Sequence, residues 1–318
     1  MKKQKFILTI VLIAILISAV VSFAGAQAKK LYIPLISKGF QHQFWLAVKA
    51  GAEKAAIDFD VTITFEGPEN ESQVDKQMDM LQVAIDKNPD AICFAAVDSK
   101  AAIPLLEQAK EKGIPVIGFD SGVDSDIPLS TASTDNIAAA ALAADKMAEL
   151  IGGAGQVAVI AHDQTSRTGI DRVKGFTDRI TEKYPNITIV ATQYGGGDHL
   201  KSTDLAKAII QGNPELKGFF GANEGSIIGV LNAVQELGMK GKLVVIGYDS
   251  GQQQMEAIRS GLLAGAITQD PIGIGYKCVE AAIKAIKGET LPKFIDTGFH
   301  WYDSTNIDDP AIAALLYK

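Results

Sequence analysis

The sequence has few cysteines and lacks the short motifs that mark catalytic or metal sites. Its 318 residues include only Cys93 and Cys278, which are too few for a disulfide framework. Two buried free thiols are one interpretation of this pair, and a single bridge is the other. The motifs G-x-S-x-G, H-E-x-x-H and C-x-x-C are missing, and the four histidines lack the spacing of metal ligands. The sequence therefore predicts no catalytic residue, no bound metal and no cofactor, and we expect a protein that is not an enzyme.

An excess of positive charge is also missing. The chain has 30 lysines and arginines against 37 acidic residues, which gives a net charge of −7. Without Lys2, Lys3 and Lys5 the net charge of the remaining chain falls to −10. An acidic chain is not expected to bind nucleic acid or an anionic membrane surface. The charge does not identify a ligand.

Long apolar runs are confined to residues 6–23, directly after those three lysines. The small-residue patterns A-G-A at 24–26 and A-Q-A at 26–28 fit a cleavage site. We therefore predict that residues 1–26 are a signal peptide and that the mature chain is periplasmic or otherwise extracytoplasmic. A retained anchor is the alternative, because an apolar run of about 18 residues can just span a bilayer. A lipid-anchored lipoprotein is not expected, since no cysteine precedes Cys93.

The remaining chain alternates short apolar runs with segments of helical period. The expected strands are residues 31–36, 61–65, 91–95, 116–119, 156–160, 187–191, 218–220 and 243–246. The expected helices are residues 44–58, 71–86, 101–111, 136–151, 169–182, 203–211, 226–237 and 252–260. Strands that are apolar throughout, each followed by a helix, are typical of parallel sheets with both faces covered. The fold class is therefore α/β.

Two features favour two similar lobes over a single barrel. The strand–helix units, about nine in number, are many for one open sheet, since sheets most often have about four to six strands. The pattern also restarts near Asp135, after a turn-rich stretch, and no low-complexity linker separates the halves. A TIM barrel is the alternative on periodicity alone.

The pattern G-[FY]-D-S-G occurs twice, at residues 118–122 and 247–251, and each copy follows an apolar run. Asp120 and Asp249 are thus placed at the carboxyl ends of strands, where open α/β sheets bind ligands. Carboxylates accept hydrogen bonds from hydroxyls, and each can accept two or more. An aspartate that caps the following turn is the alternative. The duplication favours contact with a ligand.

Aromatic residues stand at the start of the first expected helix. Phe44 and Trp45 follow the first strand by a short loop, so we expect them at the same sheet edge. Flat rings can bury the apolar face of a sugar. The alternative is that both side chains belong to the core of that helix.

Three further polar residues are candidates for binding hydroxyl groups. Arg172 offers a planar donor fork, and Asn223 and Gln269 each offer a donor and an acceptor. A salt bridge from Arg172 to Asp171 and a helix cap by Asn223 are the alternatives. These groups suit holding a polyol rather than breaking one.

The chain from about residue 30 onward resembles the ribose-type (type I) periplasmic sugar-binding proteins of bacterial ABC importers. The motifs that carry the resemblance are F-W at 44–45, G-A-E-K-A at 51–55, I-P-V-I-G-F-D at 114–120, T-D-N at 134–136, Arg172 with G-F at 175–176, A-N-E at 222–224, G-Y-D at 247–249 and A-I-T-Q at 266–269. The resemblance implies two Rossmann-like lobes with parallel sheets, joined by a three-crossing hinge that closes around the ligand. The implied lobes are residues 30–134 with 270–297, and residues 135–269 with 298–318.

The resemblance also implies roles for individual residues. Phe44 and Trp45 would stack on the sugar. The residues that would recognise its hydroxyls are Asp120, Arg172, Asn223, Asp249 and Gln269.

This sequence departs from the ribose pattern in three places. His42 stands where the ribose site has an asparagine, and Ser121 stands where it has an arginine. Gly197, or a neighbour in its glycine run, replaces a stacking phenylalanine. We keep His42 and Ser121 as candidate ligand contacts. The changes point to a ligand other than ribose in the same pose, such as a hexose, a deoxy sugar, a furanose or a sugar alcohol.

The predicted function is reversible capture of a neutral monosaccharide or polyol and its delivery to an ABC permease. A neutral ligand is favoured because two acids face one arginine. A chemoreceptor is a further candidate partner, and we expect a monomer. The alternatives are a binding protein for a furanosyl quorum signal (autoinducer), the effector domain of a lac-repressor-type regulator, and an exported enzyme on a TIM-like barrel. Regulators of that type carry an N-terminal helix-turn-helix, whereas this sequence has the predicted export signal at its N-terminus, which argues against the regulator.

Overall fold

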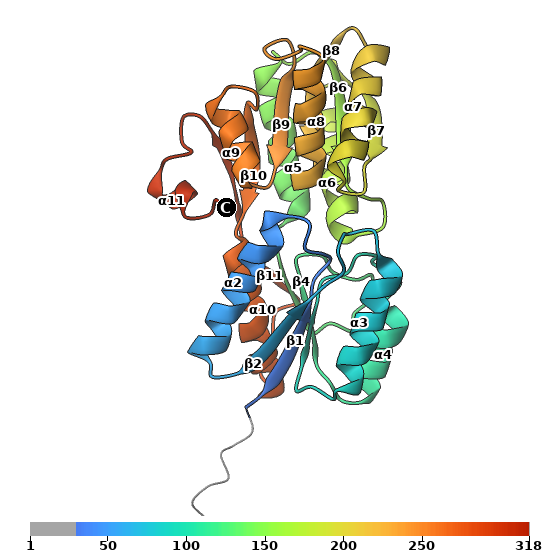
Figure 1. Cartoon of the computed structure of the whole chain (residues 1–318), viewed down its shortest axis with the longest axis vertical. Helices are drawn as coiled ribbons and strands as arrows, with labels where there is room; N and C mark the ends of the chain where they lie inside the picture. Colours follow the sequence, from blue (N-terminus) through green and yellow to red (C-terminus); the bar gives the residue numbers. More distant parts are fainter. Residues whose placement is uncertain (1–29, 318) are drawn as a thin grey trace, which may run out of the picture. The chain divides into compact units, whose positions relative to one another are not determined.

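Two six-stranded sheets organise the chain (Figure 1). The computed structural model describes residues 30–317, and the predicted signal peptide lies outside the described residues. The first sheet contains β1 (Tyr32–Ile36), β2 (Thr62–Glu66), β3 (Ile92–Phe94), β4 (Val116–Phe119), β5 (Ser130–Ser133) and β11 (Phe294–Asp296). The second contains β6 (Gly155–Ala161), β7 (Ile187–Tyr194), β8 (Leu216–Gly221), β9 (Val244–Tyr248), β10 (Gly265–Gln269) and β12 (Phe299–Asp303).

Both sheets have the same doubly wound order. The first runs β2-β1-β3-β4-β5-β11 and the second β7-β6-β8-β9-β10-β12. The expected α/β fold with two parallel sheets is confirmed, and the single TIM barrel is wrong. One strand differs, because β12 pairs antiparallel with β10, with Tyr302 opposite Ala266. The chain enters β12 from the first lobe, at the edge that the parallel strands run toward, so β12 has to run in the opposite direction.

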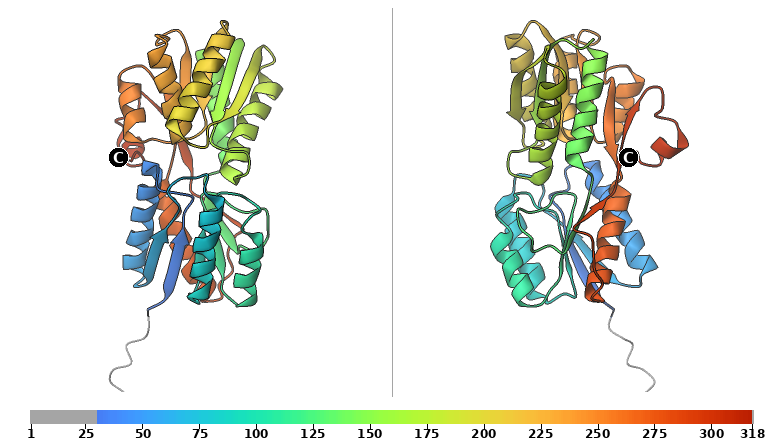
Figure 2. Two further views of the ribbon diagram at one scale, coloured as in Figure 1. Left: turned by 45° about the vertical axis from the view of Figure 1, so that its right-hand side comes forward. Right: turned by 180° about the vertical axis from the view of Figure 1, so that it is seen from behind.

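Helices cover both faces of each sheet (Figures 1 and 2). In the first lobe α2 (Gln43–Asp58) and α10 (Pro271–Ile286) lie on one face, and α3 (Val74–Asp86) and α4 (Ile103–Glu111) lie on the other. In the second lobe α5 (Asn136–Leu150) and α6 (Arg167–Lys183) lie opposite α7 (His199–Gly212), α8 (Glu224–Glu236) and α9 (Gln252–Arg259). The short α11 (Pro310–Ala313) follows β12. Buried aliphatic side chains fill each layer between sheet and helices.

The chain passes between the two sheets three times. The passages are β5 to α5 at residues 133–136, β10 to α10 at 269–271, and β11 to β12 at 296–299. Residues from Tyr32 onward form one compact unit by contacts. We therefore propose the lobe boundaries that the sequence predicts, with the three passages as the hinge.

Some element boundaries differ from the predicted ones because of helix caps. Helix α7 begins at His199 rather than near residue 203, because the Asp198 side chain accepts a hydrogen bond from the backbone N–H of Lys201.

Cys93 and Cys278 are both buried free thiols. Among residues 30–317, no helix combines the length and the apolar character needed to cross a membrane.

Helices α2 and α10 pack unusually closely, because glycines replace side chains at their contact. A Cβ atom on Gly51 would lie 2.0 Å from the backbone oxygen of Ile272. A Cβ atom on Gly275 would lie 2.0 Å from the backbone oxygen of Val48. This contact fixes α2, whose first residues reach the space between the lobes.

We expect Gly275→Ala to lower the free energy of unfolding by about 1–3 kcal/mol, because the methyl group forces the two helices apart. Gly212→Ala is the matched control. A Cβ atom at Gly212 meets no atom within 4 Å, and alanine there should be neutral or slightly stabilising. Urea denaturation measures both variants, and equal stabilities would contradict the packing argument.

Candidate ligand site between the two lobes

A small cavity lies between the lobes, at the carboxyl ends of the strands of both sheets. The empty space among its lining atoms is about 260 Å³ and includes space open to solvent, and the centre of a water molecule can occupy about 20 Å³ of it. The cavity is lined by twelve residues: Lys38, His42, Phe44, Trp45, Glu71, Asp120, His162, Thr168, Arg172, Asn223, Asp249 and Gln269.

Eight of the nine residues singled out from the sequence line this cavity. Ser121 is the exception. It is fully buried next to Asp120, its backbone oxygen accepts a hydrogen bond from Ala96, and its side chain is not part of the lining. Of these two neighbours, only Asp120 lines the cavity.

The two acids of the repeated motif have the same unusual backbone conformation. Asp120 has a φ of 54° and Asp249 a φ of 78°, in the left-handed region that non-glycine residues rarely adopt. Each backbone N–H donates to a carbonyl of the neighbouring strand, that of Asp120 to Ala132 and that of Asp249 to Ile267. Strain of this kind persists where the surrounding structure holds it, and it clusters at functional sites. The two lobes thus present their acids in equivalent ways.

The Asp249 carboxylate links three segments of the second lobe. One oxygen accepts a hydrogen bond from the Glu224 backbone N–H at 2.9 Å, and the other accepts from Gln269 Nε2 at 2.7 Å. Asn223 Oδ1 accepts from the Ser226 backbone N–H at 2.9 Å. Asn223 therefore caps α8, as the alternative interpretation held, and also lines the cavity.

Arg172 lines the cavity and is held on several sides. Its Nε donates to Asn136 Oδ1 at 2.8 Å, one terminal nitrogen donates to the Ala222 carbonyl at 3.0 Å, and the guanidinium lies 3.8 Å from the Tyr248 ring centroid. Burial alone would lower the pKa of Arg172, but nearby acidic groups raise it, so the side chain stays charged. The expected alternative partner, Asp171, pairs with Arg167 instead, at 2.6 Å.

The cavity is also lined by a second polar cluster, which the sequence analysis did not identify. Lys38 Nζ lies 3.2 Å from Glu71 Oε2 and donates to Thr168 Oγ1 at 3.1 Å. Glu71 Oε1 accepts from Trp45 Nε1 at 2.8 Å, which fixes the plane of the Trp45 ring. Burial opposes both charges, but the Glu71 carboxylate raises the pKa of Lys38, and Lys38 lowers that of Glu71. Lys38 and His162 follow the ends of β1 and β6, and this position is the signal that could have revealed them.

Burial favours the neutral form of both histidines of the lining. Burial lowers the pKa of His42 and lowers that of His162 to about 3. The side-chain amide nitrogen of Gln41 lies 2.8 Å from His42 Nε2 and can only donate, so His42 carries its proton on Nδ1. Within the described residues, His42 Nδ1, His162 Nδ1 and Gln269 Oε1 are buried and have no hydrogen-bond partner.

The charges around the cavity nearly balance. Lys38 and Arg172 are cationic, and Glu71, Asp120 and Asp249 carry carboxyl groups. Burial raises the pKa of Asp120 to about 6, although Lys38 and Arg172 lower it. A site of this kind favours a neutral ligand with many hydroxyl groups, because such a ligand can both donate and accept.

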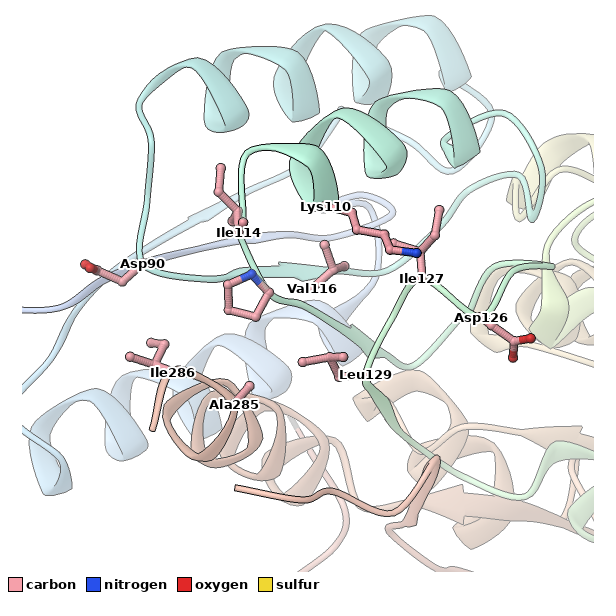
Figure 3. A pocket seen from close by; sticks show the side chains of 11 residues that line it. Asp90, Lys110, Ile114, Val116, Asp126, Ile127, Leu129, Ala285 and Ile286 are labelled. Carbon is pink, nitrogen blue, oxygen red and sulfur yellow. The ribbon is translucent and has the colours of Figure 1, made fainter. Parts of the chain in front are cut away.

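A wider hollow in the first lobe does not share these features. It lies at the amino ends of β3 and β4, away from the other lobe, and apolar side chains such as Ile114, Val116, Leu129 and Ile286 make up most of its wall (Figure 3). Asp90, Lys110 and Asp126 are its charged residues. Because the hollow belongs to one lobe alone, closure of the cleft would not grip a molecule within it.

No group of three or more histidine, cysteine, aspartate or glutamate side chains among residues 30–317 could hold a metal ion.

The periplasmic binding protein domain family matches residues 33–290 of this chain. The chain belongs to this family. It is 27% identical to the D-allose-binding periplasmic protein of Escherichia coli K12, over 85% of this chain and 88% of that protein. Two solved structures of solute-binding proteins are also similar. One, from Agrobacterium radiobacter with D-arabinose, has a TM-score of 0.88 and 32% identity over 91% of this chain and 100% of the other. The second, from Agrobacterium vitis with D-fucose, has a TM-score of 0.87 and 35% identity over 90% and 100%.

The family and its solved neighbours are sugar-binding components of ABC importers, not enzymes. The predicted class of function and the type I fold are thereby confirmed. The relatives give no support to the autoinducer alternative.

We expect Glu71→Gln to lower the free energy of unfolding by about 3–5 kcal/mol, because it leaves the buried Lys38 charge without its partner. Glu53→Gln, in the exposed pair with Lys49 on α2, should change it by at most about 1 kcal/mol.

The effect of Glu71→Gln should depend on pH. Since Lys38 lowers the pKa of folded Glu71, the wild-type advantage is full above the ordinary value of 4.5 and shrinks as the pH falls below it. Urea denaturation between pH 3 and pH 7 tests this, and a difference that stays constant over that range would contradict the pairing.

Proposed function

We propose that this chain captures a neutral monosaccharide in the cavity between its lobes and hands it to the membrane permease of an ABC importer. The observation that carries the proposal is the set of buried polar atoms without partners, His42 Nδ1, His162 Nδ1 and Gln269 Oε1, at one cavity. A buried polar group without a hydrogen bond costs about 1–3 kcal/mol. A ligand rich in hydroxyls would remove that penalty.

Different lining residues would contact different parts of the sugar. Phe44 and Trp45 offer their rings to the apolar face of the sugar. Asp120 and Asp249 accept hydrogen bonds from hydroxyl groups, and Arg172 donates to hydroxyl oxygens. His42 donates from Nδ1, and the amides of Asn223 and Gln269 serve both purposes. We assign Lys38, Glu71, His162 and Thr168 to the same site as additional contacts or supports.

Ligand capture and lobe closure follow from the same contacts. Phe44, Trp45 and Asp120 belong to the first lobe, and Arg172 and Asp249 belong to the second. A sugar that bonds to both sets stabilises the closed arrangement more than the open one, and this difference in free energy drives closure. The permease would then recognise the closed form.

The close relatives support an uncharged sugar. The proteins named above bind D-allose, D-arabinose and D-fucose by their descriptions. At Gly197 a Cβ atom would lie 2.7 Å from Gln41 Nε2 and 3.1 Å from His42 Nε2. Gln41 and His42 therefore occupy the space where the ribose pattern has an aromatic ring. This supports a ligand pose different from that of ribose.

We infer from the sequence of residues 1–26, and from the family, that the chain is exported to the periplasm or another extracytoplasmic compartment. We propose that it acts there as a monomer. A chemoreceptor is a second candidate partner besides the permease.

A panel of ligands tests the proposed function directly. One uncharged monosaccharide should stabilise the purified mature protein by about 2.7 kcal/mol at a concentration one hundred times its Kd. Differential scanning fluorimetry with pentoses, hexoses, deoxy sugars, sugar alcohols and sugar phosphates measures this. A sugar phosphate as the best stabiliser, or no stabilisation by any sugar, would refute the proposal.

We expect Arg172→Lys to weaken binding of the best sugar about 100-fold, because lysine cannot donate to Asn136, Ala222 and a ligand in the same planar arrangement. Arg179→Lys is the matched control on the same helix. Arg179 pairs with Asp145 within the second lobe, away from the cavity, so affinity should stay within twofold. Isothermal titration calorimetry measures both, and equal affinities would remove Arg172 from the binding site.

A further inference from the structure

Two helices begin face to face across the cleft, and neither is capped by its own N-cap side chain. Helix α2 of the first lobe starts after His42, whose side chain makes no capping bond. Helix α9 of the second lobe starts after Gly251, which has no side chain to offer. The first four N–H groups of a helix have no partner within it, so both helices need acceptors from elsewhere.

The acceptor for α2 comes from the opposite lobe. The carboxylate of Glu224, the first residue of α8, receives the Gln43 backbone N–H on Oε1 at 3.2 Å and the Phe44 backbone N–H on Oε2 at 3.4 Å. A carboxylate at a helix N-terminus also interacts favourably with the helix dipole. Glu224 therefore holds the first turn of α2, which carries Phe44 and Trp45, the aromatic wall of the cavity.

The acceptor for α9 comes from the first lobe in return. Gln43 Oε1 receives the Gln252 backbone N–H at 2.8 Å. Glu224 of the second lobe thus caps α2 of the first lobe, and Gln43 of the first lobe caps α9 of the second. Neither residue lines the ligand cavity, and both line a separate outer groove that spans the two lobes.

A glycine of the repeated motif allows this close approach. A Cβ atom on Gly251 would lie 3.0 Å from Gln43 Oε1 and 3.0 Å from Glu224 Oε1. At Gly122, the same position of the other motif copy, the nearest atom would be 3.7 Å away. Only the copy in the second lobe is therefore tightly packed against the residues that bridge the lobes.

We propose that Glu224 and Gln43 are reciprocal closure residues, which raise ligand affinity by capping helices of the opposite lobe in the closed state only. The inference rests on the proposed function, because it treats closure as the step that retains the sugar. Capping side chains typically change a folding equilibrium by a factor of about 2–30. The same range applies to closure here, because the bonds exist only when the lobes meet.

Glu224 also couples the cap to the ligand site. Its backbone N–H donates to Asp249 Oδ2 at 2.9 Å, while its side chain holds α2. A ligand that fixes Asp249 therefore favours the position of Glu224 in which the cap forms. Glu224 is a positioning residue, since it acts through Asp249 and the aromatic wall.

Closure should also change the protonation of Glu224. Burial, with the nearby Asp249 carboxylate, raises the pKa of Glu224 to about 7 from an ordinary 4.5, and Glu71 acts in the same direction. His199 of α7 and Glu256 of α9 are the other titratable groups of the groove. In the open cleft water reaches the carboxylate, so its pKa should return toward 4.5. Closure then takes up protons between about pH 4.5 and pH 7, and the share of closure free energy that this group supplies falls as the pH rises through that range.

Alanine variants test the closure residues. Glu224→Ala and Gln43→Ala should each weaken sugar binding about 3- to 30-fold, mainly through faster dissociation, while the melting temperature of the ligand-free protein stays unchanged. Glu256→Ala and Gln253→Ala are the controls, because both residues line the same groove from α9. Stopped-flow binding measures the rates. Dissociation rates equal to those of the controls would overturn the inference.

The glycine pair gives a test that needs no ligand. Lys112→Cys and Lys242→Cys place fluorescent labels on exposed sites in the two lobes, and the native cysteines are buried. Gly251→Ala should lower the closed fraction of the ligand-free protein, whereas Gly122→Ala should leave it unchanged. Energy transfer between the labels reports the closed fraction. Equal behaviour of the two alanine variants would count against the inference.

Proton uptake separates capping from a merely structural role. Calorimetry at pH 6 in buffers of different ionisation enthalpy should show that the wild type takes up more protons on sugar binding than Glu224→Gln. Equal uptake would contradict a titrating Glu224 at the closed interface. If no sugar binds the wild type, the proposed function fails, and energy transfer in the ligand-free Glu224→Ala, Gln43→Ala and Gly251→Ala variants still decides whether these residues favour the closed state.

Discussion

The structure depends on the hydrogen bonds of one buried carboxylate, that of Asp249. It joins the end of β9 to the start of α8 through the Glu224 N–H and to the end of β10 through Gln269. Its backbone is held in the left-handed region by Ile267 and by the hydroxyl of Tyr302. The side chain can therefore face the cavity in only one way. The polar groups of the second lobe are therefore already in position before a ligand binds.

Burying charge sets the second constraint. The lining of the cavity contains two cations and three carboxyl groups, and a charge taken out of water needs a partner. Lys38 and Glu71 satisfy each other, and Arg172 rests on Asn136, Ala222 and the Tyr248 ring. Three buried atoms of the lining residues have no hydrogen-bond partner among the described residues, His42 Nδ1, His162 Nδ1 and Gln269 Oε1. The cavity is polar and nearly neutral, and this supports the uncharged sugar that we propose as its ligand.

The sequence predicted those lining residues whose place in the cavity follows from their position at the end of a strand. Asp120, Asp249 and Gln269 come directly after apolar runs, and parallel strands bring their carboxyl ends to one edge. Lys38 and His162 stand at equivalent positions and were missed, because a single lysine or histidine after a strand carries no distinctive pattern. Glu71 and Thr168 come from loops whose path depends on packing. Ser121 was a candidate because it stands where the ribose pattern has an arginine, but it does not line the cavity.

The sequence by itself determined the α/β class, the repeated acid motif and most of the lining, because alternating apolar runs and strand-end residues are local features. Only the tertiary structure decided which atoms pair across the cleft. The ion pair of Lys38 and Glu71, the tautomer of His42 and the caps from Glu224 and Gln43 join residues far apart in the chain. Such pairings depend on how two lobes meet, and that meeting arises from long-range packing that no local pattern encodes.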